Sequence, residues 1–133
     1  MNSPRSFNVE AIVLRHRNWR EADRLITLYT RQRGKIRAVA KGARKIRSRK
    51  AGHVQPFTRI SIQVARTRGP YIITQVETLD AYPPLREDLK LTGNASYLVE
   101  LLDRFTYDEE ERNTALFNLL ENSLSRLSHG DDV

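Results

Sequence analysis

Cationic side chains are the most concentrated chemistry in this sequence. The stretch from Gly34 to Lys50 holds eight Lys or Arg and no Asp or Glu. Such a density of like charge costs self-repulsion in a folded protein unless a polyanion offsets it. Long cationic side chains can follow a phosphate backbone, and Arg adds bidentate pairing with phosphate oxygens, so binding is favoured over a merely solvated charged face. The predicted contacts to a phosphate-rich partner are Lys35, Arg37, Lys41, Arg44, Lys45, Arg47, Arg49 and Lys50.

A second cationic group surrounds the one tryptophan of the chain, Trp19. An exposed indole can stack on a nucleic-acid base, and such stacking contributes ~1–3 kcal/mol by alanine substitution. Trp19 could equally cap the end of a barrel or pack against helices, and the sequence leaves both interpretations open. The candidate group consists of Arg15, Arg17, Trp19, Arg20 and Arg24.

Residues suited to catalysis or metal binding are sparse. Glu21 and Asp23 are separated by one residue among arginines, which favours local ion pairing or capping of a turn over acid–base catalysis. The sequence has no Cys and only three His, and it contains no phosphate-binding glycine loop of the P-loop type. We therefore predict that the protein is not an enzyme and binds neither zinc nor another cofactor.

Charge divides the chain into two unlike halves. Residues 1–70 hold 18 Lys or Arg and 3 Asp or Glu, whereas residues 71–133 hold 5 and 13, so the formal charges are +15 and −8. Polyanion binding is therefore expected in the first half, and the acidic second half should avoid nucleic acid. Within the second half, the acidic run Asp108–Glu111 precedes a predicted helix, whose dipole favours carboxylates at that end.

The composition is that of a globular protein in water, with 39% hydrophobic and 29% charged residues in a chain of 133. No apolar run approaches the roughly 20 residues that a membrane span needs. The first ten residues lack the apolar core of a secretory signal. These features predict a cytoplasmic protein without membrane contact.

Alternation of apolar and polar residues predicts five strands in the first half of the chain. The polar segment Arg15–Asp23 is interpreted as the connection between the first two strands. Gly34 suits a short hairpin loop, because glycine readily adopts positive φ, so the second and third strands should be antiparallel. The predicted strands are 7–14, 24–30, 35–41, 59–65 and 71–79.

The third predicted strand should have one buried and one exposed face. Cations on a strand have a fixed backbone and lose less entropy on binding than cations of a mobile loop, so they should matter more. Within the loop, Lys45 and Lys50 fit ordinary surface best. The residues expected to face solvent are Lys35, Arg37 and Lys41, and those expected to be buried are Ile36, Ala38 and Ala40.

Five strands with one long connection between the third and the fourth fit an all-antiparallel Greek-key barrel of the OB type. Another small barrel, such as an SH3-like one, is the runner-up. Two prolines in Ala81–Pro84 end the strand pattern, and apolar residues then recur at helical spacing over about 91–105 and 116–127. We expect an OB-fold domain over residues 1–80 and, over residues 81–133, an incomplete all-helical region whose apolar stripes lack partners.

The run from Glu10 to Arg49 resembles the N-terminal barrel of RecO, a family of bacterial recombination mediators. The resemblance continues through Gln55–Phe57 and through the helical segment Ala95–Leu101, so it spans most of the chain in family order. The residues that carry it most clearly are Ala11–Leu14, Glu21, Ala22, Asp23, Arg24, Gly34, Lys35, Ala40–Arg44 and Ser48.

This resemblance implies an OB-fold followed by an all-helical domain, which in the family usually carries a four-cysteine zinc site. The sequence has no cysteine, so that site is missing, and we expect either a fragment or a short member of the family. By resemblance, the protein would bind single- and double-stranded DNA without sequence preference, anneal complementary strands and act at the nucleoid. It would work with RecR and single-stranded-DNA-binding protein (SSB) to load the RecA recombinase onto SSB-coated single strands.

Two other functions are compatible with the basic residues. An RNA-binding OB module, as found in translation proteins, would present a similar basic loop. An adaptor would use the basic strip to dock an acidic partner peptide, such as the tail of SSB. Competition between RNA and DNA, and between DNA and such a peptide, would separate these functions.

Overall fold

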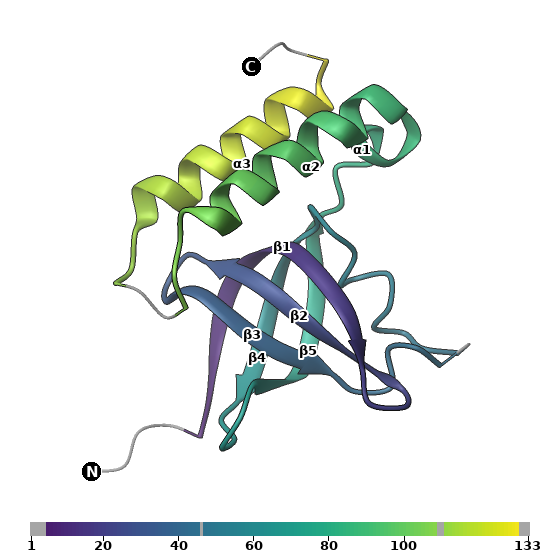
Figure 1. The fold of residues 1–133 in the computed structure, drawn as a ribbon, viewed down its shortest axis with the longest axis vertical. Coiled ribbons are helices and arrows are strands. Elements are labelled where there is room, and N and C mark those ends of the chain that lie inside the picture. The colour runs from purple at the N-terminus through teal and green to yellow at the C-terminus, as the bar shows by residue number, and fades with distance from the viewer. Residues whose placement is uncertain (1–4, 46, 109–110, 131–133) are drawn as a thin grey trace.

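A five-stranded barrel forms the N-terminal part of the protein, and two long helices lie across one end of it (Figure 1). The computed structural model describes residues 5–45, 47–108 and 111–130. The strands close in the order β1-β2-β3-β5-β4, and this confirms the predicted OB-fold class. Their bounds are β1 (Ser6–Trp19), β2 (Asp23–Thr30), β3 (Gly34–Ala40), β4 (Arg59–Ala65) and β5 (Tyr71–Asp80).

One strand pair of the barrel is parallel, so the expectation of an all-antiparallel unit was wrong. β3 and β5 pair in parallel where Ala38 meets Tyr71 and Val39 meets Ile72, whereas the other four pairs are antiparallel. Parallel neighbours need a crossover connection. The chain supplies one, because it runs through residues 41–58 and then β4 before β5 returns in the direction of β3.

β1 is longer than predicted, because Arg15–Trp19 belongs to the strand and is not a connection. The register with β2 shifts between Val13 and Arg15, and such a bulge bends a strand and increases its twist. The bent strand therefore pairs with two neighbours: residues 6–12 pair with β4 and residues 11–19 pair with β2. The bulge interrupts the alternation of side chains, which is why the sequence pattern ended too early.

The barrel interior is filled by apolar side chains from all five strands. Gly34 has φ +66° and starts β3 directly after the turn, as the hairpin prediction required. The predicted alternation also holds in β4. The inward residues of β3 and β4 are Ile36, Ala38, Ala40, Ile60, Ile62 and Val64, all of them buried.

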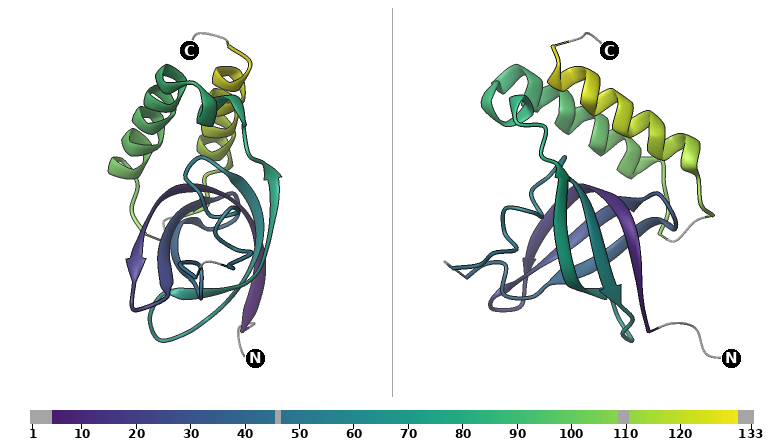
Figure 2. Two further views of the ribbon diagram at one scale, coloured as in Figure 1. Left: turned by 90° about the vertical axis from the view of Figure 1, so that its right-hand side faces the viewer. Right: turned by 180° about the vertical axis from the view of Figure 1, so that it is seen from behind.

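The helical part comprises α1 (Pro84–Glu87), α2 (Leu89–Arg104) and α3 (Thr114–Ser128). The two long helices match the predicted amphipathic segments, and each begins at a side-chain cap: Asp88 accepts from the backbone N–H of Lys90 and Leu91, and Asn113 accepts from Leu116. α2 and α3 lie side by side over the same end of the barrel (Figure 2). No helix in the described ranges is long and apolar enough to cross a membrane.

A second apolar cluster joins the barrel to the helices. Ile12, Leu14 and Tyr29 point outward from β1 and β2 and pack where the helices cover these strands. Burial of such large side chains contributes about 1.5–3 kcal/mol each, so the helices stabilise this part of the barrel surface. The helical side of the cluster includes Ala95, Val99, Leu102, Phe117, Leu120, Leu124 and Leu127.

An ionic network reinforces this junction. Glu10 on β1 accepts hydrogen bonds from Arg31 at 3.1 Å and from Arg59 at 2.9 Å. Arg59 also lies 3.4 Å from Glu121 on α3, and Arg31 donates to Asn118 on the same helix at 2.8 Å. Burial alone would raise the pKa of the Glu10 carboxyl, but the two arginines outweigh it and hold that pKa below its usual value.

Candidate nucleic-acid interface

Arginines of neighbouring strands share the outer face of the sheet formed by β1, β2 and β3, the sheet nearest the viewer in Figure 1. The register places Arg15 opposite Thr27, and Thr27 opposite Arg37. Arg17 and Trp19 follow at two-residue intervals on the same side of β1. All three arginines are exposed. We call Arg15, Arg17, Trp19 and Arg37 the strand face.

The β1–β2 turn and the start of the long loop form one continuous surface beside the strand face. The backbone N–H of Arg44 donates to the carbonyl of Ala22 at 2.9 Å, and its guanidinium donates to the carbonyl of Arg20 at 3.0 Å. Asp23 accepts from the backbone N–H of Gly42 at 2.8 Å, so this carboxylate caps a turn, as its spacing suggested. We call the exposed residues Arg20, Lys41, Arg44 and Lys45 the loop end.

Trp19 is the last residue of β1, and its indole is half-buried. The guanidinium of Arg17 lies 5.4 Å from the ring centroid, which is cation–π distance. Trp19 belongs to neither of the two apolar clusters, so it does not pack against the helices as one of the two interpretations had it. Stacking on a base stays a prediction.

Lys35 does not lie free on the strand face, and this part of the prediction was wrong. It is 7% exposed, and its Nζ donates to Oδ1 of Asp103 at 2.8 Å and to the Asp103 carbonyl at 2.9 Å. Arg15 donates to the other oxygen of the same carboxylate at 2.7 Å. Burial alone would raise the pKa of Asp103, but these two cations outweigh it and hold the pKa below its usual value. Lys35 is buried because α2, which is distant in sequence, ends directly above β3.

The connection between α2 and α3 also reaches the strand face. Lys35 and Asp108 form an isolated β-bridge, and the Asp108 carboxylate lies 3.3 Å from Nε of Arg37. Both side chains of this ion pair are about half exposed, at 47% and 48%. Exposed pairs contribute only about 0–1 kcal/mol, so a phosphate can compete for Arg37. Of the predicted acidic run, residues 109 and 110 lie outside the described residues.

The remaining predicted contacts are divided between two environments. Arg24 is two residues before the inward-pointing Ile26, and its Nε is buried without a hydrogen-bond partner, so it does not share the outer face with Arg15 and Arg17. Burial and the charge of Arg24 together lower the pKa of His16. On the long loop, Arg47 and Arg49 are exposed and Lys50 is half-buried.

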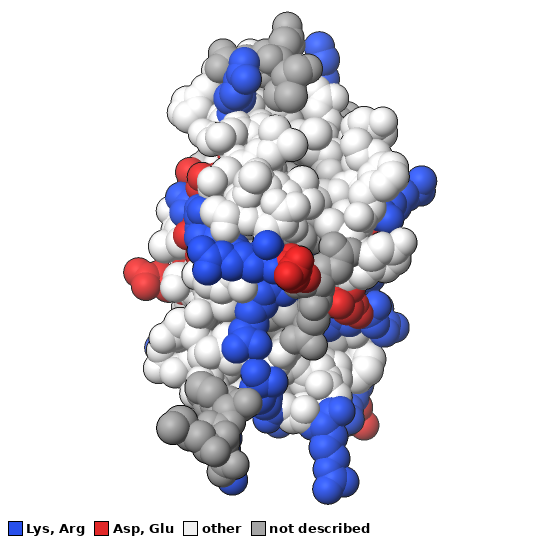
Figure 3. Space-filling model, turned by 90° about the vertical axis from the view of Figure 1, so that its left-hand side faces the viewer, with Lys and Arg blue, Asp and Glu red and all other residues white. Residues whose placement is uncertain are grey.

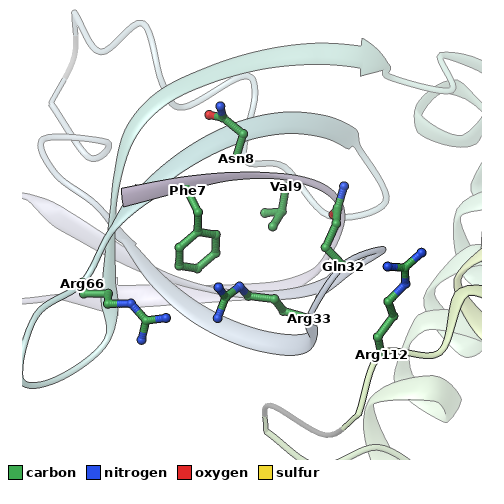
Figure 4. Close-up of a pocket in the computed structure, with 7 residues that line it drawn as sticks. All are labelled: Phe7, Asn8, Val9, Gln32, Arg33, Arg66 and Arg112. Atoms are coloured by element: carbon green, nitrogen blue, oxygen red, sulfur yellow. The ribbon is translucent and has the colours of Figure 1, made fainter. Parts of the chain in front are cut away.

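Sequence reasoning missed a group of arginines on another side of the barrel. Arg33 follows β2, Arg66 follows β4 and Arg112 precedes α3, yet all three line one open hollow of about 710 Å³ beside Phe7 (Figure 4). These residues are dispersed over most of the chain, in three segments that the sequence does not connect. No local pattern could have united them; only the folded barrel does.

Comparison with known proteins places the chain. A family model described as "Recombination protein O N terminal" matches residues 1–82, and one described as "Recombination protein O C terminal" matches residues 86–133. The chain belongs to the RecO family. A protein named "DNA repair protein RecO" from Pelotomaculum thermopropionicum is 44% identical over 125 residues, which are 94% of this chain and 48% of that protein. RecO proteins so named from Roseiflexus sp. and Geobacter metallireducens are 42% and 40% identical over 95% and 96% of this chain and 44% and 52% of their own lengths.

The chain thus spans about half the length of the RecO relatives it matches. Within the part that the structure describes, no three His, Asp or Glu side chains are grouped so that they could hold a metal ion. The expectation that this chain binds no cofactor stays a prediction.

Proposed function

We propose that this RecO chain is the strand-holding part of a recombination mediator in DNA repair. It would bind single- and double-stranded DNA through phosphates and without sequence preference. The observation that carries the proposal is the continuity of the strand face with the loop end, because it sets strand cations and loop cations side by side on one surface. The names of the RecO relatives, DNA repair proteins, support the same role.

The proposed contacts differ in how firmly the fold holds them. Arg17 on β1 and Arg37 on β3 stand on strands that both pair with β2, and they can bind a phosphate with little loss of conformational entropy. Arg44 comes next in rigidity, because its guanidinium donates to the Arg20 carbonyl. The exposed loop residues Arg47 and Arg49 would follow the strand as adaptable contacts. Lys35, held by Asp103, is not included.

Strand annealing follows from the same electrostatics. Two single strands repel each other through their phosphates, and cations that neutralise part of this charge let the strands approach. No bond is formed or broken, so the proposed role is not enzymatic. A site of action at the nucleoid in the cytoplasm follows from the DNA substrate.

The helical half is proposed as the protein-docking part. α2 and α3 leave an apolar groove of about 260 Å³ between them, and its rim includes Leu101, Phe105 and Leu119, which are 39%, 77% and 62% exposed. Partners proposed from the family resemblance are RecR and SSB, with RecA loaded onto SSB-coated strands as the outcome. The acidic charge of this half keeps DNA on the barrel.

The salt dependence of DNA binding tests the proposal. If about six to eight phosphates are contacted, log affinity for an oligonucleotide should fall with log salt at a slope of roughly −4 to −7, measured by fluorescence anisotropy. Arg17→Gln/Arg37→Gln should weaken binding and make the slope shallower by about 1.5. A slope near zero would exclude binding through phosphates. RNA of equal length as competitor separates the DNA role from an RNA-binding one.

One observation favours an adaptor as the second candidate. Two carboxylates of the same chain already form ion pairs with the strand face, Asp103 with Arg15 and Asp108 with Arg37. An acidic peptide such as an SSB tail could bind in the same way. Charge reversal in Arg37→Glu/Lys41→Glu should weaken DNA binding more than peptide binding if the DNA role is correct. The opposite ranking would favour the adaptor.

A further inference from the structure

The hollow beside Phe7 gathers three guanidinium groups that the DNA-binding proposal does not use. Arg33 comes from the β2–β3 turn, Arg66 from the end of β4 and Arg112 from the segment before α3 (Figure 4). The hollow has a volume of about 710 Å³, and none of the residues that line it is acidic. It therefore offers room and positive charge together.

The ring of Phe7 orders two of these groups. The Cζ of Arg33 lies 3.8 Å from the ring centroid and that of Arg66 lies 5.6 Å from it. Tyr71 contacts the ring edge-on at 5.3 Å and 86°. A guanidinium stacked on a ring keeps its N–H edges available and has lost its rotational freedom already. Phe7 thus serves as a support for cations and is not open to a stacked base.

Two of the three arginines in the hollow lack a carboxylate partner among the described residues. Neither Arg33 nor Arg112 forms a salt bridge with any described carboxylate, although Arg112 donates to the Thr114 hydroxyl at 3.2 Å. The strand face differs, since Asp103 and Asp108 neutralise part of it. Guanidinium groups gathered in one hollow repel each other, and a bound anion would reduce that repulsion.

The hollow is connected to the strand face. A neighbouring hollow of about 440 Å³ is lined by Arg37, Tyr71 and the acidic Asp108 among others, and it shares Arg66 with the first. Arg37 is a member of the strand face, so cations follow each other from Arg37 to Arg66 and Arg33. On this side of the molecule, Lys and Arg side chains form a nearly continuous column down the barrel (Figure 3).

We propose that Arg33 and Arg66, supported by Phe7, bind the phosphate backbone of a nucleic-acid strand that has already crossed the strand face. This inference rests on the proposed DNA-binding function and extends it. The bound strand would bend around the edge of the barrel past Arg37 and would not end there. Long strands should therefore gain contacts that short strands cannot reach.

The test compares oligonucleotides of about 6 and about 16 nucleotides, which lie near the two ends of the roughly 4–16 nucleotides that one OB fold can bind. Arg33→Gln/Arg66→Gln should lose roughly four- to twenty-five-fold in affinity for the long strand, since exposed charge pairs contribute about two- to fivefold each. Its affinity for the short strand should be unchanged. The matched control is Lys90→Gln/Arg126→Gln, which removes the same charge from exposed positions on the helices and should leave both affinities unchanged.

The outcomes separate this inference from the proposed function. If Arg33→Gln/Arg66→Gln matches the control while Arg17→Gln/Arg37→Gln weakens both strands, the hollow is not a DNA contact and the proposed function stands. If Arg17→Gln/Arg37→Gln also matches the control, the proposed function itself fails.

A measurement on the unmodified chain avoids any effect of substitution on folding. The Nε–Hε NMR signals of Arg33 and Arg66 should shift when the 16-nucleotide strand is added. Two results would overturn the assignment to a nucleic-acid strand. One is that inorganic phosphate shifts these signals and DNA does not; the other is that an acidic peptide such as polyglutamate shifts them more than DNA does.

Discussion

Lys35 and Lys41 stand at opposite ends of the same basic strand segment, and the protein uses them differently. Lys35 lies under α2 and is neutralised by Asp103, whereas Lys41 is exposed at the loop end. The two residues have the same chemistry and were expected on the same face. A cation that is buried against a carboxylate of the helical half is therefore lost as a DNA contact, whereas an exposed one stays available.

Stability should show the largest contrast between the two lysines. Lys35→Met leaves Asp103 with Arg15 alone, and because breaking a buried ion pair costs up to 3–5 kcal/mol, we expect a loss of about 2–3 kcal/mol in the free energy of unfolding. Lys41→Met should change it by less than about 0.5 kcal/mol. Urea unfolding measures both, and equal losses would contradict the assignment of Lys35 to the core of the junction.

DNA affinity should show the reverse order. Arg20→Gln/Lys41→Gln removes two exposed cations of the loop end and should weaken binding of a single-stranded oligonucleotide roughly four- to twenty-five-fold at low salt. Lys35→Met should leave the affinity of the folded protein unchanged. Fluorescence anisotropy provides the measurement, with Lys90→Gln/Arg126→Gln as the control for net charge. A larger loss in Lys35→Met would restore Lys35 as a contact.

The ion pairs of Asp103 with Lys35 and Arg15 should also make the free energy of unfolding depend on pH. The folded-state pKa of Asp103 lies below its unfolded value of about 3.9, so its contribution is present above that value and is lost as pH falls through the folded pKa. Urea midpoints of the wild type and of Asp103→Asn should therefore converge below about pH 4. A difference that stays constant down to pH 2 would show that this carboxylate is not the ionised partner of Lys35 and Arg15.

The smallest effect is expected where the two halves touch at the surface. Asp108→Asn removes a carboxylate that competes with phosphate for Arg37, so DNA affinity should rise about two- to fivefold at most. Glu87→Gln changes the net charge equally at an exposed position on α1 and should raise affinity less. If both variants gain equally, only the net charge matters and the contact between Asp108 and Arg37 does not restrain binding.

Features with a local cause were predictable from the sequence. Alternation located β3, β4 and β5, Gly34 located the hairpin, and helical spacing located α2 and α3. Features with a tertiary cause were not. The bulge after Val13 interrupted the alternation and concealed the second half of β1. The ion pair of Lys35 with Asp103 could not be predicted, because the two residues are far apart in the sequence.

The candidate interface follows the same division. Arg37 was placed on the outer face of its strand by alternation, whereas Arg17 was selected as a neighbour of Trp19 in a segment that was expected to be a connection. Arg24 was misplaced because it was grouped by its neighbours in sequence rather than by its strand face. The hollow of Arg33 and Arg66 was missed because its parts meet only when the barrel closes.

The Glu10 network connects the barrel directly to α3. Through Arg31 and Arg59, a carboxylate of β1 is linked to Asn118 and Glu121 of α3. Because these links and the apolar cluster join α3 to β1, we expect a protein that pulls on α3 to move β1 and any strand lying on it. A partner docked on the helices could thus steer DNA mechanically without touching it.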